Sequence, residues 1–164
     1  IMVLPHFEGA QSPWMDPNAR GAVLGLTLAT SRADIVNGIL EGITYELRLN
    51  LERMQAVGVS VSELRASGGG ARSPRWLQLK ADVTGKPVMS LNVTEAGCLS
   101  AAVLAGTGAG VYASAAEAVD QLVHVVRIYE PNRQRQARYD QRYEAYLDAY
   151  PATRGISHAM SGAC

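Results

Sequence analysis

The chain has 164 residues, of which 48% are hydrophobic and 18% charged, and fifteen basic residues balance fifteen acidic ones. This length suits one domain with a hydrophobic core, and the composition excludes a disordered chain. The balanced charge predicts no general attraction to nucleic acid or acidic membranes. Two cysteines give neither a disulfide framework nor a metal-ligand spacing, and no secretory leader is visible, so we expect a cytoplasmic protein.

The N-terminal part of the chain predicts a strand followed by a long loop. Residues 1–7 are apolar enough for the strand. Residues 8–21 are dense in Gly, Pro and Asp, which are typical of loops. We expect Asp16 to have a structural role here, with Arg20 as its partner in an ion pair that holds the loop.

A long helix is predicted over residues 32–56. Ser31 and Asp34 have the spacing of a capping box, in which each side chain satisfies a backbone N–H at the helix start. Gly58 is a natural stop. Apolar residues recur every four positions and predict the face turned toward the core. This predicted core face contains Ile35, Ile39, Ile43 and Leu47.

Short strands and helices alternate through the middle of the chain. A strand over residues 64–67 runs into a glycine triplet, and Ser73 followed by Pro74 is a good start for a helix to about residue 84. Residues 86–92 predict the next strand. The pattern continues with helices and a further strand, which argues for an α/β fold but does not fix the strand order.

The most apolar stretch covers residues 96–112. It is shorter than the roughly 20 apolar residues that a membrane span needs, and it is rich in glycine and alanine. We therefore predict a buried core helix, capped by Thr94, with Cys98 as a small buried hydrophobic residue.

The last third of the chain predicts two helices and a strand. Ser114 and Glu117 form a second capping box, and residues 123–129 alternate weakly as a strand. A final helix is predicted over residues 131–150. The tail at residues 152–164 has no periodicity and is predicted to be disordered or non-native. One face of the final helix carries Tyr139, Tyr143, Tyr146 and Tyr150, a spacing that favours a packing surface.

The glycine triplet Gly68-Gly69-Gly70 is the best candidate for chemistry. Glycine lets the backbone approach a ligand closely, and the N-terminus of the following helix presents free N–H groups and positive dipole to an anion. The phosphates or ribose of a nucleotide suit such a place. The spacing is neither that of a P-loop nor that of a dinucleotide-binding motif, and a plain turn is the alternative.

Several blocks of the sequence resemble the FGGY carbohydrate kinases. The stretch SGGGARSPRWLQLKADVTGKP (67–87) resembles the adenosine-binding segment of that family, and FEGAQSPWMDPNARGAVLGL (7–26) resembles its Pro- and Asp-rich loop. TEAGC (94–98), with the small-residue helix after it, resembles a third family block. Gly38 departs from the family, which usually has Ala or Ser there. The blocks occur in the family order and span residues 3–151.

The resemblance implies an α/β fold: the C-terminal ribonuclease H-like domain of the actin/hexokinase-type ATPases, without its first strands. Residues 1–151 would form part of a C-terminal nucleotide-binding domain. By position in the family motif, the backbone of Gly69 lies against the nucleotide phosphates, Gly68 and Gly70 shape the same turn, and Ser73 reaches the adenine edge. ATP with Mg²⁺ is the implied cofactor.

The family phosphorylates a sugar or polyol, and xylulose or a related ketose is the first candidate. Its catalytic aspartate and sugar-binding domain precede the region matched here, so we assign no catalytic or metal-binding residue in this chain. The expected ligands are ATP or ADP and a sugar bound mainly by that other domain, with no nucleic acid and no membrane; a homodimer is left open.

Two other functions fit the same residues. One is a non-catalytic nucleotide-binding or regulatory module of the actin-like superfamily, and the other is a structural domain in which the glycine triplet is only a turn. An upstream domain with a catalytic aspartate distinguishes the kinase from the first alternative. Failure to bind ATP favours the second.

Overall fold

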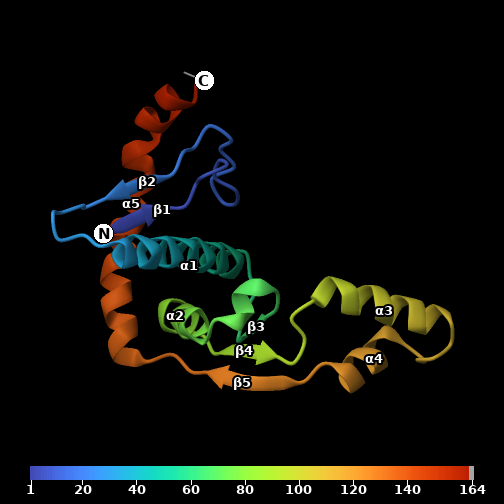
Figure 1. Cartoon of the computed structure of the whole chain (residues 1–164). Helices are drawn as coiled ribbons and strands as arrows, with labels where there is room; N and C mark the ends of the chain where they lie inside the picture. The colour runs from blue at the N-terminus through green and yellow to red at the C-terminus, as the bar shows by residue number, and fades with distance from the viewer. Residues whose placement is uncertain (163–164) are drawn as a thin grey trace. The chain divides into compact units, whose positions relative to one another are not determined.

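The computed structural model describes residues 1–162, which divide into two compact units. Unit 1 comprises residues 1–61, 82–85 and those from 132 onward, and unit 2 comprises residues 62–81 and 86–131. Figure 1 shows the helices and strands of both. The boundary predicted at residue 151 stays a prediction, and Cys164 lies outside the described residues.

Unit 1 begins with a small antiparallel sheet. Its strands are β1 (Met2–Leu4) and β2 (Ala22–Leu24), paired so that Val3 lies opposite Val23. Val3 and Leu4 of β1 are buried. The strand predicted over residues 1–7 is therefore shorter than expected, and β2 was not predicted, because three residues inside a loop carry too little alternation to be recognised.

The long helix α1 (Arg32–Ala56) has the predicted bounds. The Ser31 Oγ accepts a hydrogen bond from the Asp34 backbone N–H at 3.2 Å, and the Asp34 carboxylate accepts one from the Ser31 backbone N–H at 2.8 Å. The predicted capping box is confirmed. Gly58, with φ of 88°, follows the end of the helix, as expected for a residue that leaves the helical conformation.

The buried face of α1 differs from the predicted one. Ile35 and Ile43 are each 37% exposed, so the prediction of an isoleucine core face was wrong. The helix contacts β1 instead, and a Cβ on Gly42 would collide with the Val3 carbonyl oxygen. Only a residue without a side chain lets α1 come this close to β1. Gly42 therefore determines which face of α1 packs against the strand. The buried residues of α1 are Gly38, Gly42, Thr44, Tyr45, Leu49 and Leu51.

The last helix, α5 (Arg133–Ser161), begins as predicted but runs further. The Asn132 side chain caps it by accepting two backbone hydrogen bonds. The helix continues through Pro151, so residues 152–161 are helical and the prediction of a loose segment there was wrong. Its second half is held by side-chain contacts to the loop between β1 and β2. The tyrosine stripe is confirmed as packing surface, since Tyr143, Tyr146 and Tyr150 are buried.

Unit 2 contains a three-stranded sheet in the order β3-β4-β5. Strand β3 (Leu64–Ala66) runs parallel to β4 (Val88–Leu91), and β5 (Val125–Tyr129) runs antiparallel to β4. Helix α2 (Pro74–Thr84) follows a short 3₁₀ helix, η1 (Gly69–Arg72). The last residues of α2, from Asp82 onward, belong to unit 1. The core beneath α2 consists of Leu77, Ala81, Val88 and Tyr129, with Leu64 and Ala66 packed against it.

Two further helices complete unit 2, α3 (Ala96–Gly108) and α4 (Ala115–Leu122). They contact each other, but in α3 only Val103 is buried, while Cys98 is exposed, so the prediction of a buried α3 was wrong. The reason is that α4 covers one side of a helix that is apolar all round. No helix in residues 1–162 is long and apolar enough to cross a membrane.

The caps predicted for α3 and α4 are only partly confirmed. The Ser114 Oγ accepts from the Glu117 backbone N–H at 3.1 Å, as predicted, but the Glu117 carboxylate accepts from Ala113 rather than from Ser114. Glu95, not Thr94, occupies the cap position of α3, and within the described chain its side chain makes no capping hydrogen bond.

Candidate functional site

The two parallel strands of unit 2 end at the same edge of the sheet. Ligands of α/β proteins commonly bind outside the carboxyl ends of parallel strands, where the following loops lead into helices. Here β3 leads into the glycine triplet, and β4 leads into residues 92–95 before α3. The Gly68 backbone N–H donates to the Thr94 carbonyl oxygen at 2.9 Å and joins the two loops. We call residues 68–72 the glycine turn.

The three glycines of this turn have different surroundings. Gly68 has φ of 80°, a conformation that favours glycine. A Cβ on Gly70 would lie 2.8 Å from the Trp76 ring. Gly69 has neither constraint: its φ is not positive, and a Cβ there would meet no atom of the described residues within 4 Å. The backbone at Gly69 is therefore open to a ligand.

Ser73 follows the glycine turn and caps α2. Its Oγ accepts from the Trp76 backbone N–H at 3.3 Å, and its carbonyl oxygen accepts from the Leu77 backbone N–H at 3.0 Å. The predicted cap is confirmed. The contact of Ser73 with adenine, like the nucleotide contacts of the three glycines, stays a prediction.

Basic side chains accompany the turn. The Arg72 Nη2 donates to the Glu95 Oε1 at 3.1 Å, which adds a second link between the two loops. On α2, the Lys80 Nζ lies 4.3 Å from the centre of the Trp76 ring, and burial lowers the pKa of Lys80. Together with the positive end of the α2 helix dipole, Arg72 makes this edge suitable for an anion.

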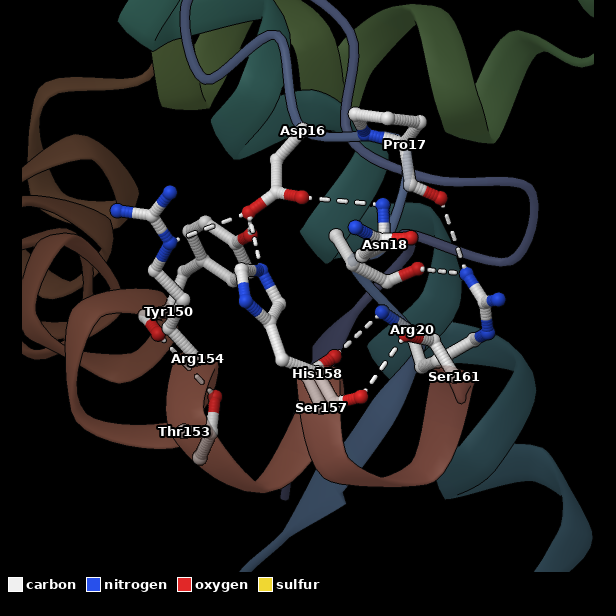
Figure 2. Close-up of polar contacts among 11 residues, drawn as sticks. Asp16, Pro17, Asn18, Arg20, Tyr150, Thr153, Arg154, Ser157, His158 and Ser161 are labelled. Carbon is white, nitrogen blue, oxygen red and sulfur yellow. Dashed lines mark hydrogen bonds and ion pairs between the residues drawn. The ribbon is translucent and has the colours of Figure 1, made fainter. Parts of the chain in front are cut away.

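A second polar cluster lies in unit 1 around Asp16 (Figure 2). Asp16 is 6% exposed and follows Trp14 and Met15 in the loop between β1 and β2. Its carboxylate accepts from the Tyr150 hydroxyl at 2.5 Å, from the Arg154 Nε at 3.1 Å and from the Asn18 backbone N–H at 3.0 Å, and lies 2.7 Å from the His158 Nε2. The donor side chains all come from α5.

These contacts stabilise the ionised form of Asp16. The hydrogen bond from Tyr150 and then that from His158 hold the pKa of Asp16 well below its ordinary value. Burial, followed by the hydrogen bond to Asp16, raises the pKa of Tyr150 to about 12. A carboxylate already occupied by four partners is poorly suited to take a proton from a substrate. The arrangement supports the predicted structural role of Asp16.

The partner predicted for Asp16 was wrong. The Arg20 guanidinium donates to the carbonyl oxygens of Pro17 and Ala19, at 3.1 and 2.8 Å, and its backbone N–H donates to the Ser157 Oγ. The arginine that pairs with Asp16 is Arg154, 138 residues further along the chain. Local spacing indicates an arginine near the aspartate, but it contains no signal for a partner on a distant helix.

Comparison with known proteins decides the family. The family model for the C-terminal domain of the FGGY family of carbohydrate kinases matches residues 1–109, two thirds of the chain. The chain belongs to the FGGY family of carbohydrate kinases. Its fold is the α/β, ribonuclease H-like C-terminal domain of the actin/hexokinase type, as the resemblance implied. The family is one of phosphotransferases.

Individual relatives agree with this assignment. A xylulose kinase of Staphylococcus epidermidis is 30% identical over 96% of this chain and 32% of its own length. A glycerol kinase of Dechloromonas aromatica is 39% identical over 80% of the chain and 26% of its length. The solved xylulose kinase of Rhodospirillum rubrum has a TM-score of 0.78 at 27% identity, over 96% of this chain and 31% of that one. The chain spans between about a quarter and a third of the length of these kinases.

Proposed function

We propose that this protein transfers the γ-phosphoryl group of ATP to a hydroxyl of a sugar or polyol. Membership of the FGGY family supports the reaction class. Xylulose or a related ketose is the first candidate acceptor, because the chain is similar over nearly its whole length to proteins named xylulose kinase. Similarity to glycerol kinases makes a polyol the second candidate.

Within that protein we assign this chain one wall of the ATP site, at the glycine turn. The observation that carries the assignment is the surroundings of Gly69, where neither backbone conformation nor packing within the described residues accounts for the glycine. Close approach of a ligand to the backbone is one physical reason for such a glycine, and the place of Gly69 after β3, at the carboxyl end of the parallel strands and before α2, favours that reason here. In this proposal the positive end of the α2 helix dipole and the Arg72 guanidinium lie toward the phosphates, and Ser73 lies toward the adenine.

Mg²⁺ enters this proposal with ATP. When bound with ATP, the ion would supply positive charge that offsets the negative charge developing during phosphoryl transfer. In residues 1–162 no group of three or more His, Cys, Asp or Glu side chains is placed to hold a metal ion. We assign the metal no ligand in this chain, and the contribution proposed for the described residues is to bind and orient the nucleotide.

The chain by itself is expected to have no sugar kinase activity. Phosphoryl transfer needs an acceptor hydroxyl, a base and the γ-phosphate in line, and a misplacement of about 1 Å can cost on the order of 100-fold. Measuring ADP release with ketoses, aldoses and polyols checks this, with an ATP-only blank as the control. Sugar-dependent turnover at rates typical of kinases would contradict it.

A substrate survey on the full-length protein tests the proposed function. We expect ATP-dependent phosphorylation, with kcat/KM highest for xylulose or a related ketose. Nucleotide binding without turnover on any sugar or polyol would instead support a non-catalytic nucleotide-binding module. If neither ADP nor ATP binds, the glycine turn is only a turn and the assignment of the ATP wall fails.

A further inference from the structure

Arg72 and Gly69 share one face of the glycine turn. They are the last and first residues of η1, and side chains three positions apart in a 3₁₀ helix eclipse one another. The two residues therefore lie on the same side of η1, and the Arg72 side chain, which contacts Glu95, leaves at least 4 Å free around a Cβ at position 69. A phosphate seated against the Gly69 backbone would have the Arg72 guanidinium on the same face of the turn.

Glu95 holds Arg72 from the neighbouring loop. The two side chains are 64% and 69% exposed and meet at 3.1 Å. Glu95 stands at the cap position of α3, yet its carboxylate contacts Arg72 rather than the N–H groups of the described helix. The hydrogen bond from the Gly68 N–H to the Thr94 carbonyl oxygen holds the two loops beside each other, and this keeps the backbones that carry Arg72 and Glu95 close together.

We propose that Arg72 binds the phosphates of the nucleotide and that Glu95 is a positioning residue acting through Arg72. The inference rests on the proposed nucleotide site. A guanidinium has five N–H donors, and only one of its nitrogens contacts Glu95 here, so a phosphate and the carboxylate can bind at the same time. Arginine suits this role because its donors match phosphate oxygens in pairs.

Titration of the full-length protein with ADP and with adenosine tests the role of Arg72. We expect Arg72→Ala to weaken ADP binding about tenfold at low salt while adenosine, which has no phosphates, binds as before. Arg72→Lys keeps the charge and should bind ADP within about threefold of the parent. The loss in Arg72→Ala should shrink at high ionic strength, because the site is exposed.

A double-mutant cycle tests the role of Glu95. Glu95→Gln should weaken ADP binding about threefold in the parent, through loss of the charge that orients Arg72, and should have no weakening effect when Arg72 is already alanine. An equal loss in both backgrounds, or tighter ADP binding by Glu95→Gln in the parent, would overturn the positioning role. Both residues are mostly exposed, and thermal melts check that each variant is folded.

Comparison with Gly69→Val separates this inference from the proposed function. If Gly69→Val loses ADP while Arg72→Ala binds it normally, the nucleotide site stands and the role of Arg72 is wrong. If a folded Gly69→Val and Arg72→Ala both bind ADP as the parent does, the site itself is wrong and the inference falls with it.

Discussion

Gly42 in α1 and Gly69 in the glycine turn lie in opposite surroundings. A Cβ on Gly42 would collide with the Val3 carbonyl oxygen, whereas a Cβ on Gly69 would meet no described atom within 4 Å. The first glycine lets a helix contact a strand, and the second leaves backbone open at the end of a strand. One residue type thus marks packing in unit 1 and a candidate binding surface in unit 2.

The polar groups of the two regions differ in the same way. Asp16 is buried, and four partners from its own loop and from α5 occupy its carboxylate. Arg72 and Glu95 are exposed and contact each other through one hydrogen bond, which leaves guanidinium donors for a ligand. Buried and occupied groups hold a fold together, whereas exposed groups beside open backbone are available for binding.

Gly42→Val is expected to have the largest effect on stability. The valine side chain must displace β1, and overpacking of this kind costs about 3 kcal/mol or more when backbone is in the way. Gly97→Val is the matched control, because a Cβ at Gly97 in α3 meets nothing described within 4 Å. Urea unfolding of both variants checks the difference. Equal stability of the two would mean that α1 does not contact β1 as described.

Asp16→Asn should be the next most damaging change, with a pH dependence. Since the folded-state pKa lies below the ordinary 3.8, the carboxylate stabilises the fold above that pH, and this contribution is lost as the pH falls through the lowered pKa. Asp16 is faced by Tyr150, Arg154 and His158. The difference in unfolding free energy between parent and variant should be full at pH 7 and shrink below about pH 4.

Asp34→Asn is the control for that measurement. Its carboxylate is exposed, and its pKa is lowered by the hydrogen bonds from Ser31. We expect a smaller loss of stability at pH 7 than for Asp16→Asn. If thermal melts at neutral pH ranked the two variants the other way, the Asp16 cluster would not be the main attachment of α5 to the loop.

Ser73→Ala should have the smallest effect of the changes considered. Loss of the helix cap costs about 1 kcal/mol of stability. Loss of the proposed hydrogen bond from Ser73 to adenine would cost about 0.5–1.5 kcal/mol, or roughly a 2- to 13-fold weaker affinity for ADP. Melting and ADP titration must be done on the same preparation. Unchanged ADP affinity in a protein with the expected loss of stability would leave Ser73 as a cap alone.

Local patterns predicted the elements with strong end signals. The bounds of α1 follow from its capping box and from Gly58, and the glycine turn with its Ser73 cap was found from residue type and spacing. The inward face of α1 was missed because hydrophobic periodicity counts isoleucines, whereas contact with β1 selects Gly38 and Gly42, which such a count ignores.

Contacts between distant residues were beyond local patterns. Proline predicts the end of a helix, but α5 continues past Pro151, where Ser157 and His158 bind the loop at Arg20 and Asp16. The link from Arg72 to Glu95 likewise joins two loops that only the parallel pairing of β3 and β4 brings together.

ADP binding by Gly69→Val in the full-length protein tests the central claim most directly. Because position 69 needs no glycine for packing, the variant should fold and melt within a few degrees of the parent, as should the Gly97→Val control. Valine covers the backbone where phosphates are proposed to lie, so calorimetric titration should show ADP affinity at least about 30-fold weaker, or 2 kcal/mol, with sugar binding retained. A folded Gly69→Val that binds ADP like the parent would contradict the account and leave the glycine turn without a ligand.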